Sequence, residues 1–305
     1  MWATYVLLLD QTAVYGGTPQ NNSSVPRGKR KRDTEEIMDI EGSPYAMLNA
    51  QAPTLSKALL NQVKSPKTPP ATLQAGFKLL NTLLTVLPGA LCTQVPSALA
   101  TTKNILAQPP TTSTSSLYLT CLSFLKLFFS SLPPPTLADS LPAMTEVLLK
   151  SVGEKHPRVA SESFRVFSSL LNAIKPVKNI DWVQKLYEAA LSRLSLYDTD
   201  PEVRAAAEEC IGDLWICAND MMKGKGKEWE YICRLTGHTE GPVKIVAKVA
   251  SEVQMGDVWV NGSVSWLLEL TRRGSRAGKG DIFAGLEVLL RGLVRLFTRV
   301  LHWFA

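Results

Sequence analysis

The residues best placed to do chemistry lie in one short segment, Asp198 to Leu214, with the sequence DTDPEVRAAAEECIGDL. Asp198 and Asp200 are carboxylates separated by a single residue, and Cys210 is a nearby thiol. Paired carboxylates can share acid and base roles, and a thiol can act as a nucleophile. No histidine accompanies them at catalytic spacing. We therefore expect helix capping from the aspartates and a structural role for the cysteine.

The three histidines do not form a metal site. His156 precedes a proline, His238 lies in a glycine-rich stretch and His302 lies near the C-terminus, with no cluster of cysteines or carboxylates beside them. The sequence has no GxSxG, HExxH or Walker-type loop, and the KGKGK stretch at 223–227 lacks the Ser or Thr of a phosphate-binding loop. We expect no enzyme activity, no metal, no cofactor and no small-molecule substrate.

The cysteines and the charge indicate the cellular setting. The five cysteines form no CxxC pair and lie in or beside apolar segments, which predicts buried, reduced thiols: Cys92, Cys121, Cys210, Cys217 and Cys233. The net charge of +6 and the pI near 9.0 arise largely from one run, Lys29, Arg30, Lys31 and Arg32. The run lies in a segment with few large apolar residues, which predicts a disordered basic and acidic linker at 16–44.

The basic run has two interpretations. It has the density of a nuclear-import signal, and it can equally be a solubilising stretch balanced by nearby acidic residues. Nucleic-acid binding is disfavoured because aromatic residues are not interleaved with the basic ones. We expect residence in the nucleus and the cytoplasm.

In the elements around these residues, apolar side chains recur at helical spacing almost throughout the chain. Fifteen-residue stretches from Pro70, Pro157 and Pro201 align without a gap, and each has proline in its first helical turn. A less regular copy begins at Ser115 and contains the apolar run Leu117 to Leu132, which is too short for a membrane span and predicts a buried helix. The period is about 40 to 47 residues, typical of HEAT and armadillo repeats.

Each of these second helices is preceded by an amphipathic first helix, predicted at 52–63, 95–106, 141–152 and 180–194. Less regular pairs follow to the C-terminus. The sequence therefore predicts an all-α HEAT-repeat α-solenoid of about six helix pairs, in which stacking buries faces that one pair cannot bury alone. The expected domains are 1–15, a helix of an incomplete first repeat; 16–44, the linker; and 45–305, the solenoid.

Each position at the start of the last regular copy has a predicted role. Asp200 caps the helix, Pro201 begins it, and Val203 enters the core. The small residues Ala205 to Ala207 allow close helix approach. We expect Arg204 to pair with an acidic group of the adjacent repeat rather than to contact a ligand.

Three segments carry a family resemblance: GSPYAMLNAQAPTLSKALLNQVKSPKT from Gly42, LLTVLPGALCTQVPSAL from Leu83 and SRLSLYDTDPEVRAAAEECIGDLWICAND from Ser192. In order and spacing they resemble the central repeats of the cullin-associated and neddylation-dissociated protein family, over about Ala3 to Ala284. The resemblance implies a non-enzymatic scaffold that binds a cullin–RING complex lacking its ubiquitin-like modifier and promotes receptor exchange in SCF-type ubiquitin ligases. The chain is far shorter than a full member, which favours a separate C-terminal companion chain. A karyopherin-like or other HEAT adaptor is the alternative within the binding class.

Two sets of residues are candidate contacts. The second helices are expected to line the concave binding side, with contacts from Arg158, Glu162, Arg165, Glu202 and Glu208. Near the C-terminus a charged stripe of Glu287, Arg291, Arg295 and Arg299 lies among apolar residues. That helix can pack on the companion chain through Leu289, Leu293, Leu296, Phe297 and Trp303, or it can lie on a membrane surface, which we disfavour. A third interpretation is that the last twenty residues come from a shifted reading frame and form no native helix.

Overall fold

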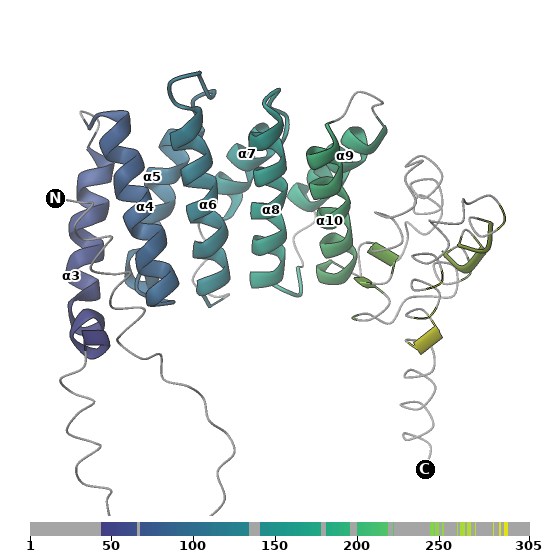
Figure 1. Ribbon diagram of the computed structural model, residues 1–305, viewed down its shortest axis with the longest axis horizontal. Coiled ribbons are helices and arrows are strands. Elements are labelled where there is room, and N and C mark those ends of the chain that lie inside the picture. Colours follow the sequence, from purple (N-terminus) through teal and green to yellow (C-terminus); the bar gives the residue numbers. More distant parts are fainter. Residues whose placement is uncertain are drawn as a thin grey trace, which may run out of the picture. The chain divides into compact units, whose positions relative to one another are not determined.

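The computed structural model describes residues 44–65, 68–133, 141–177, 181–195 and 200–218, together with isolated positions 222, 245–246, 248–249, 252, 261, 263–265, 267–269, 272, 283, 287 and 290–291. The regular elements within these ranges are helices (Figure 1). They belong to two compact units, residues 1–144 and 145–305. The predictions for 1–15 and for the linker up to residue 43 lie outside the described residues.

The second helices are uniform. Each has 17 residues: α4 (Pro70–Val86), α6 (Ser115–Ser131), α8 (Pro157–Ala173) and α10 (Pro201–Cys217). Their first residues are 45, 42 and 44 positions apart, which confirms the predicted period. Proline begins three of them because its fixed φ suits the first turn and its missing N–H has no helical acceptor there.

The first helices vary more in length. They are α3 (Pro44–Lys64), α5 (Val95–Leu106), α7 (Leu141–Val152) and α9 (Asp181–Ser195), with a short 3-10 helix η1 (Cys92–Gln94) before α5. The bounds of α5 and α7 are those predicted. Helix α3 begins eight residues earlier than expected and continues through Pro53. The segment before Pro53 is rich in the helix formers Ala, Leu, Met and Gln, and this propensity outweighs the one hydrogen bond that the proline removes.

In the first unit, α4 and α6 pack along each other, and α3 and α5 cover them (Figure 1). Aromatic rings fill the contact between α4 and α6. Phe77 meets Phe124 edge to face at 5.4 Å between ring centroids, and Phe124 stacks on Phe128 at 5.2 Å. All three rings are fully buried. Burying one such ring stabilises the fold by roughly 1.5–3 kcal/mol, so this aromatic column holds the two second helices together.

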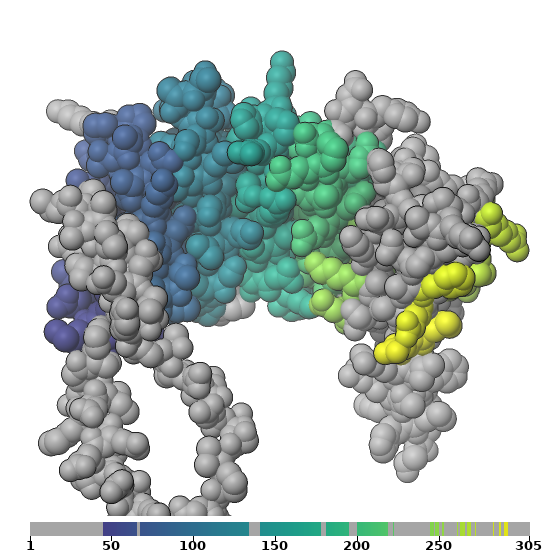
Figure 2. Space-filling view, in the orientation of Figure 1, coloured from purple at the N-terminus to yellow at the C-terminus, as the bar shows by residue number. Residues whose placement is uncertain are grey.

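In the second unit, α10 packs against both α8 and α9, and the surfaces of α8 and α10 adjoin in the space-filling view (Figure 2). Small residues allow this approach: Ala206 and Ala207 are buried, and a Cβ on Gly212 would lie 3.3 Å from the side chain of Ile245. Ala205, which was predicted to allow close helix approach together with these two alanines, is exposed instead. Helix α10 is therefore enclosed on most sides.

The start of α10 confirms most of its predicted roles. The carboxylate of Asp200 accepts a hydrogen bond of 2.9 Å from the backbone N–H of Glu202, and Val203 is buried. Arg204 is structural as expected, but its guanidinium donates to the carbonyl of Leu194 at the end of α9, within its own repeat, at 3.1 Å. A main-chain carbonyl at a helix end attracts a cation because the last carbonyls lack intrahelical donors.

A second arginine caps the C-terminal end of a helix that lies further away in the sequence. The Nη2 atom of Arg193, on α9, donates to the carbonyls of Val152 at 2.8 Å and Glu154 at 3.1 Å. These carbonyls belong to the end of α7 and the turn after it, about forty residues earlier. One repeat therefore supplies the cap for a helix of the preceding repeat.

Three of the predicted core cysteines are buried: Cys121, Cys210 and Cys217. Burial raises the pKa of Cys121 and, with the charge of Asp213, that of Cys210. The prediction is wrong for Cys92, which is exposed. Cys92 begins η1, three residues after a glycine with φ of 94° turns the chain. Cys233 lies outside the described residues.

The apolar run of α6 is the buried helix that the sequence predicts, since eight of its residues lie in the core. Across the described ranges, no helix combines the length and the apolar character needed to cross a bilayer. Beyond α10, the isolated described positions are helical, and those from residue 245 onward fall within the later predicted pairs.

Candidate protein-binding surface

On the second unit, Arg165 of α8 lies between two carboxylates. It donates to Oε1 of Glu162, one turn earlier, and to Oε1 of Glu202 on α10 at 3.1 Å. Partial burial lowers the pKa of Arg165, but the hydrogen bonds and charges of Glu162 and Glu202 outweigh it, so the pKa is raised overall. Exposed pairs of this kind contribute little to stability, but here they fix the position of a guanidinium on the surface.

Further along the same two helices, a buried carboxylate joins three helical segments. Asp213 of α10 is 2% exposed, and its Oδ1 accepts from Asn172 of α8 at 3.2 Å and from Nζ of Lys248 at 2.7 Å. Partial burial lowers the pKa of Lys248, but its hydrogen bond to Asp213 and the neighbouring negative charges raise it overall. We call Asn172, Asp213 and Lys248 the polar ladder. It links consecutive repeats through groups that would be costly to bury alone.

One more ion pair continues the polar ladder. Lys175, just after α8, lies 3.2 Å from the carboxylate of Glu252, one helical turn after Lys248. The charged groups of this surface are thus paired with one another across repeats. Such an arrangement offers fixed charges and hydrogen-bonding groups to a partner, and it contains no activated nucleophile or general base.

The structure places four of the five predicted contact residues on or near this surface. Arg158 and Glu202 are exposed in the first turns of α8 and α10, and Glu162 and Arg165 are half-buried beside them. It brings Glu162, Arg165 and Glu202 into one cluster. Their role in binding stays a prediction.

Glu208 does not belong to this surface. It is buried, with 7% exposure, which corrects its assignment as a contact residue. Six residues separate it from Glu202, and six steps of a helix rotate a side chain by about 240°. Glu208 follows Arg204 by four residues and so lies on the side of α10 that faces α9.

The remaining predicted positions cannot be placed. Lys29, Arg30, Lys31 and Arg32 lie outside the described residues, as do Leu289, Leu293, Leu296, Phe297 and Trp303. Of the charged stripe, Glu287 and Arg291 are described and form an exposed ion pair of 2.6 Å. Phe283 and Leu290 on the same segment are more than half exposed.

Sequence reasoning missed the polar ladder, although one signal was present. Asp213 stands in the run ECIGDLWIC, where its neighbours on both sides are apolar. A carboxylate in such a run is expected to be buried and therefore to need a cation or several donors. The identity of that cation, Lys248, depends on how the repeats stack.

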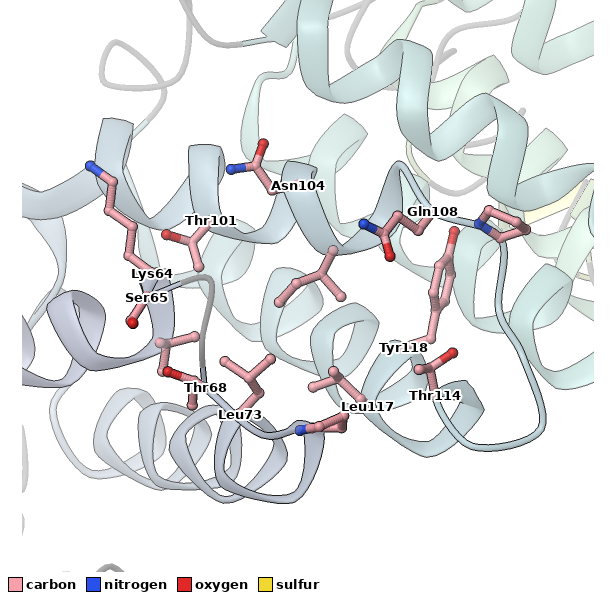
Figure 3. A pocket seen from close by; sticks show the side chains of 14 residues that line it. Lys64, Ser65, Thr68, Leu73, Thr101, Asn104, Gln108, Thr114, Leu117 and Tyr118 are labelled. Carbon is pink, nitrogen blue, oxygen red and sulfur yellow. The ribbon is translucent and has the colours of Figure 1, made fainter.

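The first unit contains a pocket of about 340 Å³, shown in Figure 3. It lies where the C-terminal ends of α3 and α5 meet the N-terminal ends of α4 and α6, which also shows that α4 and α6 run in the same direction. Fourteen residues line it: Val63, Lys64, Ser65, Thr68, Pro70, Leu73, Thr101, Asn104, Ile105, Gln108, Pro109, Thr114, Leu117 and Tyr118. Among the described residues, no three His, Cys, Asp or Glu side chains are grouped so that they could hold a metal.

Comparison with protein families matches residues 81–211 to the family described as CAND1-like, TPR repeats. The match begins within α4 and ends within α10, so it includes all the residues of the Arg165 cluster. The central repeats of this chain are thus similar to those of the CAND1-like family. The spacing of 42 to 45 residues between second helices exceeds the 34 residues of a TPR unit and fits HEAT or armadillo repeats.

Curated proteins with similar sequences bear the corresponding names. The chain is 29% identical over 190 residues to cullin-associated NEDD8-dissociated protein 1 of Arabidopsis thaliana, covering 60% of this chain and 15% of that protein. It is 29% identical over 214 residues to the Drosophila melanogaster protein of the same name, covering 65% of this chain and 17% of that protein. The chain thus spans about a sixth of the length of these relatives.

Solved structures show the fold class. A designed armadillo repeat protein, in complex with a (KR)4 peptide, has a TM-score of 0.55 and 16% identity, covering 76% of this chain and 98% of the designed protein. Kap95p, in a structure with RanGDP, has a TM-score of 0.61 and 13% identity, covering all of this chain and 41% of Kap95p. The described part of the chain therefore has the fold of an all-α solenoid of the armadillo and HEAT kind.

Proposed function

We propose that this chain is a non-enzymatic scaffold that binds cullin–RING complexes and regulates the assembly and substrate-receptor exchange of SCF-type ubiquitin ligases. The observation that carries the proposal is the CAND1-like match over residues 81–211, together with the names of the curated relatives. The fold likeness to Kap95p rests on 13% identity, so it supports the solenoid and does not favour a karyopherin-like role.

The Arg165 cluster and the polar ladder are the surface that we assign to the cullin. Arginine is enriched at protein interfaces because its planar group can make several directed hydrogen bonds. Arg165 is already oriented by Glu162 and Glu202, so less side-chain freedom is lost when a partner binds. A carboxylate or carbonyl of the partner could bind the donors of the guanidinium that remain exposed.

Two finer parts of the proposal concern context. We propose a separate C-terminal companion chain, which the exposed apolar side chains near the C-terminus support. The partner would pack on the segment that contains Phe283 and Leu290, whose side chains are exposed. We also expect residence in both nucleus and cytoplasm, with the basic run as the import signal.

Affinity purification of the tagged full chain from cells tests the proposal. We expect recovery of an unmodified cullin together with the companion chain. Arg165→Glu should reduce cullin recovery by roughly tenfold, since it reverses a fixed charge at the centre of the surface. Lys185→Glu is the matched control, because Lys185 is exposed on α9 and lies outside the cluster. Recovery of import cargo with neither cullin nor companion would refute the proposal.

The membrane-surface alternative has its own test. Deleting residues 282–305 should leave the behaviour of the chain in liposome flotation unchanged, because we assign that segment to a protein partner. Loss of flotation in the deleted chain, with flotation of the full chain, would favour the membrane instead.

A further inference from the structure

The pocket of the first unit differs from the charged surface of the second in one respect. In the second unit the charged side chains around Arg165 and Asp213 satisfy each other. At the pocket, four exposed polar side chains have no hydrogen-bond or ion-pair partner within the described part of the chain: Lys64, Ser65, Asn104 and Gln108. They are free to bind groups brought by another molecule.

The wall of the pocket formed by α5 has a regular spacing. Thr101, Asn104 and Ile105 lie at i, i+3 and i+4 on one face of α5, and Gln108 follows two residues after the end of the helix. The amides of Asn104 and Gln108 therefore lie four residues apart in sequence, at the C-terminal end of α5 and just beyond it. Each side-chain amide can donate to and accept from the backbone of an extended peptide segment.

The opposite wall is apolar at its centre, with Thr68 and Thr114 beside the leucines (Figure 3). Leu73 of α4 and Leu117 of α6 face the α5 wall, and Gln108 and Tyr118 are at one end (Figure 3). Leu73 is only half-buried, so part of its surface remains available to a ligand. Because side chains of an extended segment alternate in direction, one set can fill this wall while the other set points to the rim.

The charge of the pocket determines which side chains of the bound segment suit the rim. Among the described residues that line the pocket, Lys64 is the one charged residue and none is a carboxylate. The helix dipoles favour neither sign of charge in a ligand, because the negative C-terminal ends of α3 and α5 meet the positive N-terminal ends of α4 and α6 at the pocket. A negative side chain at the rim is therefore favoured by Lys64.

We propose that this pocket binds an extended segment of a protein partner in which apolar and acidic residues alternate. The apolar side chains enter the space between Leu73, Ile105 and Leu117, the backbone bonds to Asn104 and Gln108, and an acidic side chain pairs with Lys64. The pocket volume is in the range of specific ligand sites, which suits one or two side chains rather than a folded domain. The site does not depend on cullin binding by the second unit.

Fluorescence anisotropy on the full chain tests this site with three fluorescein-labelled peptides of about eight residues, long enough to span the pocket in extended form. One alternates Asp and Leu, one alternates Lys and Leu, and one alternates Asp and Ser. We expect the Asp/Leu peptide to bind with a Kd below about 1 mM and at least tenfold more tightly than the other two. Equal binding of all three, or no measurable binding of the Asp/Leu peptide, would overturn the proposal.

Variants locate the binding. Lys64→Glu should weaken binding of the Asp/Leu peptide by roughly tenfold, since it replaces a positive charge that lines the pocket with a negative one. Lys103→Glu is the matched control, because Lys103 is exposed on the same helix as Asn104 but does not line the pocket. The double variant Asn104→Ala with Gln108→Ala should weaken binding without a charge change. Equal effects of the Lys64 and Lys103 substitutions would place the peptide elsewhere. Far-UV circular dichroism confirms that each variant is folded.

Discussion

Replacing Asp213 with alanine should destabilise the second unit far more than replacing any exposed carboxylate of the same helix. Asp213 is 2% exposed and accepts hydrogen bonds from Lys248 and Asn172. A hydrogen bond to a charged group contributes about 1.5–3 kcal/mol. Lys248 is 36% exposed, so water can partly replace its lost partner, and the full cost of an orphaned buried charge does not apply. We expect a loss of about 2–3 kcal/mol in the free energy of unfolding.

Urea unfolding followed by far-UV circular dichroism measures the loss. Repeat proteins can unfold repeat by repeat, so hydrogen exchange of the α8 and α10 amides should accompany it and show the loss locally. Glu209→Ala is the control, because Glu209 is exposed on the same helix, and its effect should stay within about 0.5 kcal/mol. A double-mutant cycle with Lys248→Met should give a coupling energy of about 1–2 kcal/mol.

Two results would refute the reasoning. Equal losses for Asp213→Ala and Glu209→Ala would mean that the buried carboxylate is no more important than an exposed one. A coupling energy near zero between Asp213 and Lys248 would mean that their 2.7 Å contact does not hold the two repeats together.

Three further predictions follow from the core and the caps. Asp200→Ala should cost about 1 kcal/mol in unfolding free energy by thermal denaturation, because it removes the side-chain cap of α10, whereas Asp200→Asn should cost less. Phe124→Ala should cost about 3–5 kcal/mol in the same measurement, because it empties the centre of the aromatic column; a loss below 1 kcal/mol would contradict that packing. Alkylation by iodoacetamide at pH 8, read by peptide mass spectrometry, should modify exposed Cys92 and spare Cys217, since burial and the charge of Asp213 raise the pKa of Cys217 to about 11. The folded state holds that thiol proton more tightly than the unfolded state does, so the stability from Cys217 is complete below about pH 8.5 and is lost as the pH rises through about 11.

The helices could be predicted from the sequence because their signals are local. Proline at Pro70, Pro157 and Pro201 begins a helix by its own geometry, and the apolar face of each helix repeats within a few turns. The start of α3 was harder to predict because Pro53, inside the helix, gives the signal of a helix start. Local signals therefore fixed the period well and one boundary poorly.

The candidate site was harder to predict from the sequence. Rotation about the helix axis would have separated Glu208 from Glu202, because their spacing excludes a shared face. The bond between Asp213 and Lys248 joins residues 35 positions apart, and the pocket is lined by residues of four helices, from Val63 on α3 to Tyr118 on α6. Such contacts depend on the offset between stacked repeats, which no short stretch of sequence encodes.

The cap that Arg193 provides for α7 bears on how such a protein can gain or lose repeats during evolution. A deletion that removes α9 would leave the carbonyls of Val152 and Glu154 without their donor, even if every remaining helix were intact. The unit that can be gained or lost intact therefore does not coincide with one helix pair. It runs from one first helix to the capping arginine on the first helix of the next repeat. Insertions and deletions that keep each first helix together with its capping arginine should survive selection, and those that separate the two should not.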